Sequence, residues 1–149
     1  MNKILDRQAY ISVSYRLRKS LEEELNVITQ TLARDSYQSF VFVDRHQFLP
    51  SQEKEMMQQA MADIDRSVIL LAEASDKGSG IGIEVGYAKA KRKPVIYLRK
   101  MTAEHSTTVS GISDFQIIYE DVDDLREQLS RVLQAIQRLL TFPEQISSY

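Results

Sequence analysis

The sequence contains no cysteine and no tryptophan, and only two histidines, His46 and His105, among 149 residues. The absence of cysteine excludes disulfides, thiolate zinc sites and a cysteine nucleophile. Two histidines argue against a multi-histidine metal site, so we expect neither a metal nor another cofactor. No hydrophobic run approaches the roughly 20 residues that span a bilayer, and no signal-peptide pattern opens the chain. We therefore expect a cytoplasmic protein with no membrane partner.

Charge and composition are moderate. The net charge of −2 gives no general attraction for nucleic acid, and we expect none as a partner. Hydrophobic residues make up 43% and charged residues 27%, as in ordinary globular proteins. The length predicts a single domain over residues 1–149, with a core at about 9–140 and short polar tails.

Hydrophobic periodicity predicts alternating strands and helices. Strands are expected at residues 9–13, 40–43, 68–72, 94–98 and 115–119, with polar loops at 44–50 and 99–113. Helices are expected over 17–32, from an N-cap at Ser51 to 64, from the glycine-rich stretch to 93, and over 122–140. This alternation predicts a flavodoxin-like α/β domain with a five-stranded, mainly parallel sheet and helices on both faces. The preferred strand order is 2-1-3-4-5.

In that order, ligands bind beyond the carboxyl ends of the strands, where the first and third strands lie side by side. Residues 12–18 follow the first strand, and residues 76–84 follow the third. The sequence therefore predicts that these two segments meet at one site.

The second segment is rich in glycine and carries one acid. Gly78, Gly80 and Gly82 allow a ligand to approach the main chain, and a helix start attracts anions. We expect the helix dipole to hold Glu84 ionised, which suits a nucleophile or a hydroxyl-binding group. The spacing fits neither a dinucleotide fingerprint, because Val85 stands where glycine or alanine is needed, nor a P-loop. A tight turn with a solvated or capping glutamate is the alternative.

The first segment carries a hydroxyl and a guanidinium. Ser14 and Arg16 at a helix start form a reasonable phosphate site. The alternative is a helix cap followed by exposed basic residues.

Residues 10–16 (Tyr-Ile-Ser-Val-Ser-Tyr-Arg), residues 80–88 (Gly-Ile-Gly-Ile-Glu-Val-Gly-Tyr-Ala) and the end of the 99–113 loop resemble the nucleoside 2-deoxyribosyltransferase superfamily. Within it, they look most similar to the 2′-deoxynucleoside 5′-phosphate N-hydrolases. The resemblance implies a flavodoxin-like fold and cleavage of the N-glycosidic bond between a base and deoxyribose.

The resemblance also implies roles for residues. Glu84 is expected to be the nucleophile, and Ser14 and Arg16 to hold the 5′-phosphate beside Tyr10. Ser106 is a candidate for a further phosphate contact, often made from a neighbouring subunit, so a homo-oligomer of two or more chains is expected. The remaining residues expected at the substrate are Ser12, Gln59, Gly78, Gly80 and Gly82.

One expected acid is missing. Gln59 stands where the family has an aspartate, and a glutamine cannot protonate a leaving group. Asp63, one turn further along the same predicted helix, is the candidate replacement, and Glu55 lies one turn earlier. The alternative is that these are ordinary surface acids on a solvated face.

The leading hypothesis is hydrolysis of a 2′-deoxynucleoside 5′-monophosphate through a glutamyl intermediate. Base exchange, as in a nucleoside 2-deoxyribosyltransferase, is the first alternative. A non-catalytic nucleotide-binding or sensor module is the second, and Gln59 is the residue that favours it.

Overall fold

A computed structural model describes residues 7–141 of the chain; most of the predicted polar tails, at residues 1–8 and 141–149, lies outside that range. Its centre is a five-stranded sheet in the order β2-β1-β3-β4-β5. Every neighbouring pair of strands is parallel. The predicted fold class and strand order are therefore confirmed. The strands are β1 (Arg7–Val13), β2 (Tyr37–Val41), β3 (Ile69–Glu73), β4 (Val95–Lys100) and β5 (Phe115–Tyr119).

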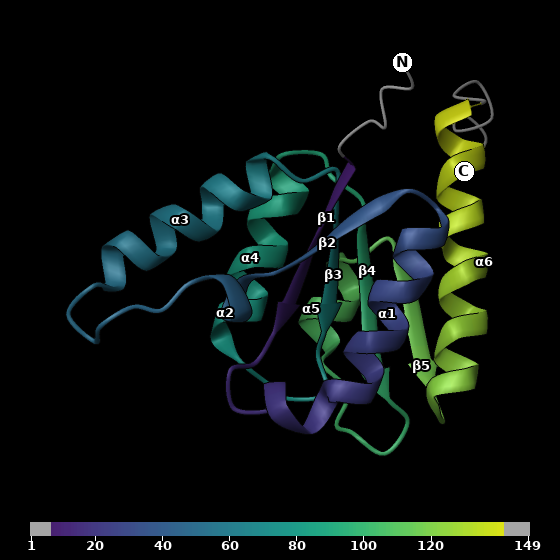
Figure 1. Cartoon of the computed structure of the whole chain (residues 1–149), viewed down its shortest axis with the longest axis horizontal. Coiled ribbons are helices and arrows are strands. Elements are labelled where there is room, and N and C mark those ends of the chain that lie inside the picture. Colours follow the sequence, from purple (N-terminus) through teal and green to yellow (C-terminus); the bar gives the residue numbers. More distant parts are fainter. Residues whose placement is uncertain (1–6, 142–149) are drawn as a thin grey trace.

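Helices cover both faces of the sheet (Figure 1). One face carries α1 and α6, and the other carries α2, α3, α4 and α5. Within residues 7–141, no helix combines the length and the hydrophobicity needed to cross a bilayer. The helices are η1 (Arg18–Leu21), α1 (Glu22–Arg34), α2 (Phe42–Arg45), α3 (Glu53–Asp65), α4 (Ser79–Ala90), α5 (Thr107–Ile112) and α6 (Val122–Thr141).

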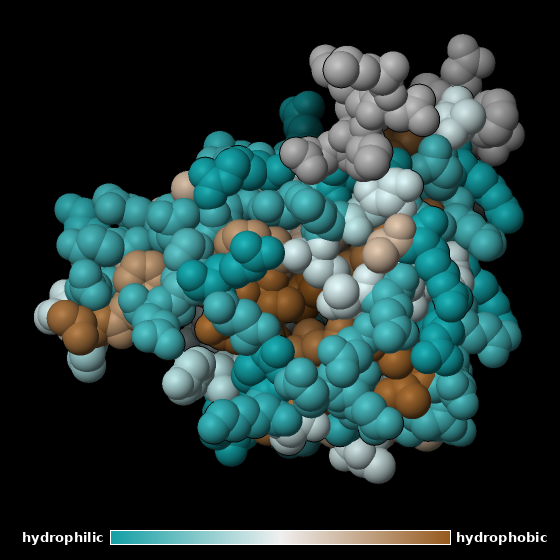
Figure 2. All heavy atoms as spheres, viewed as in Figure 1, coloured by the Kyte–Doolittle hydropathy of each residue, from teal (hydrophilic) through white to brown (hydrophobic). Residues whose placement is uncertain are grey.

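Each strand supplies side chains to two hydrophobic clusters, because successive residues point to opposite faces. In β1, Ala9 and Ile11 pack with α1 and α6, whereas Tyr10 packs with α2, α3 and α4. Burial of both faces explains why β3 is buried at every position. Figure 2 shows hydrophobic atoms gathered at the centre of one face, with hydrophilic residues around them.

The second strand differs from its prediction. β2 begins at Tyr37 rather than residue 40, and Phe42, predicted to be in the strand, begins the short helix α2. The main chain pairs from Arg7 with Tyr37 to Ile11 with Val41, and the Arg7 guanidinium lies 4.1 Å from the centre of the Tyr37 ring. Pairing with β1, rather than the hydrophobic pattern of residues 40–43, sets the limits of this edge strand.

Two further predictions are wrong in detail. The N-cap of α3 is Gln52 rather than Ser51, and the Gln52 side chain accepts a hydrogen bond from the Leu49 N–H at 2.8 Å. The predicted loop at 99–113 contains the end of β4 and the helix α5. The strand continues because the Lys100 N–H donates to the Ser75 hydroxyl at 2.9 Å.

Candidate active site

The segments that follow β1 and β3 meet at the carboxyl edge of the sheet, as predicted. The Ser14 hydroxyl donates to Asp76 Oδ2 at 2.7 Å. The Arg16 guanidinium donates to both carboxylate oxygens of Asp76, at 2.5 and 3.1 Å. These two donors lower the pKa of Asp76, the arginine more strongly than the serine. Ser14 and Arg16, hereafter the anion anchor, thus hold a carboxylate of the chain itself.

Sequence reasoning assigned no role to Asp76. The sequence feature that could have identified Asp76 is its position shortly after the third strand, at the edge of the sheet where Arg16 was expected. Parallel strands bring their carboxyl ends to one edge, so Asp76 and Arg16 could have been paired from topology. The pairing shows that the anchor can bind an anion in two-point geometry.

Glu84 lies in the second turn of α4 and not at a helix start. The helix begins at Ser79, so Gly80 and Gly82 are helical residues rather than parts of a turn. The Ser12 hydroxyl donates a hydrogen bond to Glu84 Oε2. Burial raises the pKa of Glu84, and the hydroxyls of Ser12 and Tyr10 oppose that rise. Desolvation therefore opposes ionisation of Glu84, whereas the two hydroxyls favour it.

Tyr10 projects from the middle of β1 toward the same carboxylate. Its side chain is fully buried, and its hydroxyl has no partner in hydrogen-bonding geometry within residues 7–141. Burial and the Glu84 carboxylate raise the pKa of Tyr10, so the phenol keeps its proton. The site thus contains a half-buried acid with a phenol hydroxyl beside it.

The glycines border a small cavity. A Cβ added at Gly80 or Gly82 would meet no atom of the protein within 4 Å, and no glycine in residues 7–141 has a positive φ. A cavity of about 280 Å³ is lined by Gly78 and Gly82, and also by Asp76 and Ser106. Ser106 of the same chain therefore reaches the vicinity of the anion anchor. The fold itself requires no glycine at positions 80 and 82.

A second cavity, hereafter the aromatic pocket, lies on the other side of the anchor. It has a volume of about 570 Å³. The rings of Phe42 and His46 are 5.0 Å apart, and Phe42 is 6.1 Å from Tyr10. The aromatic pocket therefore adjoins the Tyr10 side of the site. Its lining residues are Tyr15, Phe42, Val43, His46, Gln47, Phe48 and Met56.

Asp63 is buried, with 1% of its side chain exposed, whereas Glu55 is exposed. The alternative of ordinary acids on a solvated face is therefore wrong for Asp63. Its carboxylate accepts from Gln59 Nε2 at 3.1 Å and from the Arg66 guanidinium, and Oδ2 lies 2.8 Å from His46 Nε2. Gln59 is thus a hydrogen-bond donor to Asp63.

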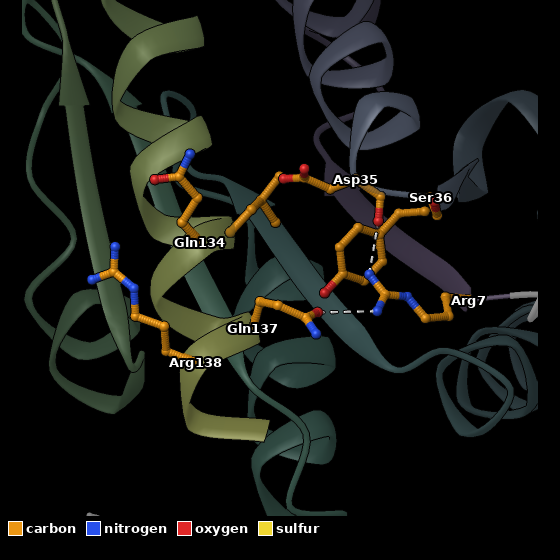
Figure 3. Close-up of a pocket in the computed structure, with 8 residues that line it drawn as sticks. Arg7, Asp35, Ser36, Gln134, Gln137 and Arg138 are labelled. Carbon is orange, nitrogen blue, oxygen red and sulfur yellow. Dashed lines mark hydrogen bonds between the residues drawn. The ribbon is translucent and has the colours of Figure 1, made fainter. Parts of the chain in front are cut away.

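A cavity of about 500 Å³ also opens at the opposite edge of the sheet. Figure 3 shows Arg7 reaching across it to the Asp35 main-chain oxygen at 2.8 Å and to Gln137 Oε1 at 3.3 Å. It lies where β1 begins, away from the carboxyl ends at which parallel sheets bind ligands. We do not assign it to the active site.

Known proteins resemble the chain in sequence and in fold. No protein-family model matches the sequence. A provisionally named 2′-deoxynucleoside 5′-phosphate N-hydrolase 1 of Thermofilum pendens is 28% identical over 133 residues, which cover 86% of this chain and 87% of the relative.

Two solved structures share the fold. The CMP N-glycosidase of Clostridium botulinum superposes with a TM-score of 0.60 at 16% identity, covering 84% of this chain and 99% of that one. The 2-deoxyribosyltransferase of Bacillus psychrosaccharolyticus superposes with a TM-score of 0.63 at 14% identity, and the match covers 85% of this chain and 95% of that one. The resemblance of this chain to the nucleoside 2-deoxyribosyltransferase superfamily, and within it to the 2′-deoxynucleoside 5′-phosphate N-hydrolases, is thereby confirmed.

Proposed function

We propose that the chain hydrolyses the base–deoxyribose bond of a 2′-deoxynucleoside 5′-monophosphate, with Glu84 as the nucleophile. The names of the relatives support N-glycosidase or deoxyribosyltransferase activity. The observation that carries the finer proposal is the location of one half-buried carboxylate. Glu84, bonded to Ser12, lies in the same corner of the fold as the anion anchor, Ser14 and Arg16.

The anchor would orient the substrate. The 5′-phosphate replaces the Asp76 carboxylate on Ser14 and Arg16, and Ser106 is the further donor at the adjoining cavity. The pair between Arg16 and Asp76 is exposed on the arginine side, so a dianion can displace it at little cost. The sugar is then directed toward Glu84.

The Glu84 carboxylate would act on the sugar. As the bond from the base to C1′ breaks, positive charge develops on the sugar, and ionised Glu84 forms an ester bond to C1′. Water then attacks C1′, releases the Glu84 carboxylate and gives deoxyribose 5-phosphate. The Tyr10 hydroxyl beside Glu84 is the donor available to the sugar or to the carboxylate.

Base release from a panel of nucleosides and nucleotides tests this proposal. We expect free base from a 2′-deoxynucleoside 5′-monophosphate and a loss of at least about 10³-fold in Glu84→Gln, the order found when a nucleophile is removed. Glu104→Gln is the matched control, because Glu104 is an exposed acid paired with Lys77. Base release that survives Glu84→Gln contradicts the proposal.

The Asp76 contact favours base exchange on an unphosphorylated nucleoside as a second candidate. A carboxylate that already neutralises Arg16 suits a free 5′-hydroxyl better than a phosphate. Product that forms from a nucleoside only when a second base is added would identify this reaction. Nucleotide binding without base release under either condition would instead identify a non-catalytic binding module.

A further inference from the structure

We infer that His46 is the acid that protonates the departing base, and that Asp63 is its positioning residue. This inference rests on the proposed N-glycosidase function and supplies the proton donor that Gln59 cannot be. It is carried by the contacts around the buried Asp63 carboxylate, by the location of the His46 ring in the aromatic pocket, and by the position of Tyr10.

The network fixes the imidazole. His46 Nε2 lies 2.8 Å from Asp63 Oδ2, and the carboxylate is held in turn by Arg66 and Gln59. A carboxylate accepts hydrogen bonds, so Nε2 carries the proton of this contact. Nδ1 forms no hydrogen bond with residues 7–141, and 26% of the side chain is exposed. One ring nitrogen is therefore anchored, and the other is available to a ligand.

The aromatic pocket supplies a surface for a planar base. Phe42 and Phe48 lie 5.0 and 5.7 Å from the His46 ring, centre to centre. Bases stack on such faces whatever their hydrogen-bonding edge. A base in the aromatic pocket would lie against His46.

Tyr10 connects the aromatic pocket with Glu84. The Tyr10 ring lies 6.1 Å from that of Phe42, which lines the aromatic pocket. The Glu84 carboxylate beside the phenol raises the pKa of Tyr10, after its burial. A sugar over Glu84 and a base in the aromatic pocket would lie on two sides of Tyr10, as cleavage of the bond between them requires.

The proton balance closes. The imidazolium of His46 gives its Nδ1 proton to the base as the bond to C1′ breaks, and the base leaves neutral. The Glu84 ester is then attacked by water, whose proton returns to Nδ1. Asp63 faces the ring from α3 and accepts from Nε2, and Arg66 donates to the same carboxylate. Arg45, the preceding residue on α2, lies over the Phe40 ring at 5.5 Å.

Asp63 itself is poorly placed to protonate a base. Its two oxygens receive three donors, and only 1% of its side chain is exposed. A carboxylate in that setting orients a histidine, as in other acid–base pairs. The sequence-based candidate for the acid therefore acts through His46.

The test compares two substrates of the wild-type protein and of His46→Gln. The first is the deoxynucleotide that the protein hydrolyses best. The second carries an activated base that leaves without protonation: the 7-methyl derivative for a purine, or a 5-nitro derivative for a pyrimidine. The glutamine amide can still donate to Asp63 from the position of Nε2, but it has no proton to transfer. We expect kcat on the first substrate to fall by about 10²- to 10³-fold, and on the second by less than about 5-fold.

Three outcomes overturn the inference. The first is an undiminished rate of His46→Gln on the ordinary substrate. The second is an equal loss of rate on both substrates, which indicates a structural role for His46. The third is the absence of base release by the wild-type protein. Glu84→Gln separates the two proposals, because it should abolish activity on both substrates. If Glu84→Gln is inactive and His46→Gln is not, only the role of His46 fails.

Discussion

Glu84 owes its chemical character to desolvation. A carboxylate in water is a weak nucleophile, whereas a buried one has lost much of its hydration. Burial raises the pKa of Glu84, and the Ser12 hydroxyl limits that rise by bonding to the charged form. Desolvation and the Ser12 hydrogen bond thus shift the pKa of Glu84 in opposite directions, and Ser12 extends the ionised form to lower pH.

Ser12→Ala should move the acid limb of the pH profile. Removing the Ser12 hydroxyl removes a bond to ionised Glu84, so the pKa of Glu84 rises further above its ordinary value. Activity that requires the ionised form is lost as pH falls through that pKa, and the fall therefore begins at a higher pH. The measurement is kcat/KM between pH 4 and 8. Ser14 bonds to Asp76 rather than to Glu84, so Ser14→Ala should leave the acid limb of the pH profile in place.

Asp76→Asn should strengthen binding of phosphate. Asp76 competes with a 5′-phosphate for Ser14 and Arg16, and its loss removes both the competitor and a nearby negative charge. We expect affinity for a deoxynucleoside monophosphate to rise by roughly 3- to 10-fold, within the range of one modest coupling, with little change in melting temperature. Titration calorimetry measures the affinity of the variant and of the wild-type protein for this nucleotide.

Asp44→Asn is the matched control for that change, because Asp44 makes the same two-point contact with Arg18. Unchanged or weaker phosphate binding in Asp76→Asn would show that the carboxylate does not compete for the anchor. Binding that tightens equally in both variants would indicate a general effect of charge.

At the scale of elements, α4 has glycines that its own packing does not require. In a helix, glycine is less favourable than alanine by about 0.8–1.0 kcal/mol. Gly80→Ala and Gly82→Ala should each raise the free energy of unfolding by up to that amount. Both should also raise KM if these glycines contact the substrate; Gly82 lines the cavity beside Asp76, so its added methyl would enter that cavity. Thermal unfolding and steady-state kinetics test both effects.

Gly86→Ala is the control within the same helix, since its added Cβ also meets no protein atom within 4 Å. It should gain stability without a change in KM. Gains in stability at 80 and 82 with unchanged KM would contradict a role for these glycines at the substrate.

The buried acid Glu73 joins β3 to β5. The Tyr119 hydroxyl donates to Glu73 Oε2 at 2.6 Å, and Glu73 Oε1 accepts from the Ser75 N–H at 2.7 Å. Tyr119→Phe removes one donor from a buried acceptor and should cost about 1–3 kcal/mol. For a chain of this size, that lowers the melting temperature by about 2–4 °C per kcal/mol.

Tyr87→Phe provides the comparison, because the Tyr87 hydroxyl donates to Asp65 at the surface. Its change should stay within about 0.5 kcal/mol. Similar losses of unfolding free energy in both variants would show that the buried Tyr119 contact stabilises the fold no more than a surface contact does.

The elements that sequence reasoning located best have strong periodicity and two-sided burial. Strand β5 was predicted with both of its limits, and α6 nearly so. The limits of β2 depend on pairing with β1, and α5 is a short helix in a polar segment with Val109 as its buried residue. The hydrophobic pattern alone therefore predicts neither the limits of β2 nor the presence of α5.

For the whole molecule, alternation of strands and helices was enough to predict the sheet order and the edge at which the site lies. The order brought Ser14, Arg16 and Glu84 together before any side chain was placed. The same topology also places Asp76 near Arg16, but the His46–Asp63 pair was beyond that reasoning. That pair depends on the side-chain directions of a loop and of α3, which spacing does not encode.

Some predictions at this scale stay predictions. They are the single domain over residues 1–149, the cytoplasmic location, and the homo-oligomer of two or more chains. Light scattering of the purified protein checks the last of these. A monomer would leave Ser106 to act within its own chain, where it already lines the cavity beside Asp76.

The account depends most on covalent catalysis by Glu84. Intact-mass spectrometry of the protein, quenched in acid during turnover of its best deoxynucleotide, tests this directly. We predict a mass increase of one deoxyribose 5-phosphate group, less water, assigned by peptide fragmentation to Glu84 and absent from Glu84→Gln. Rapid base release without such an adduct, or an adduct on another residue, would contradict the account.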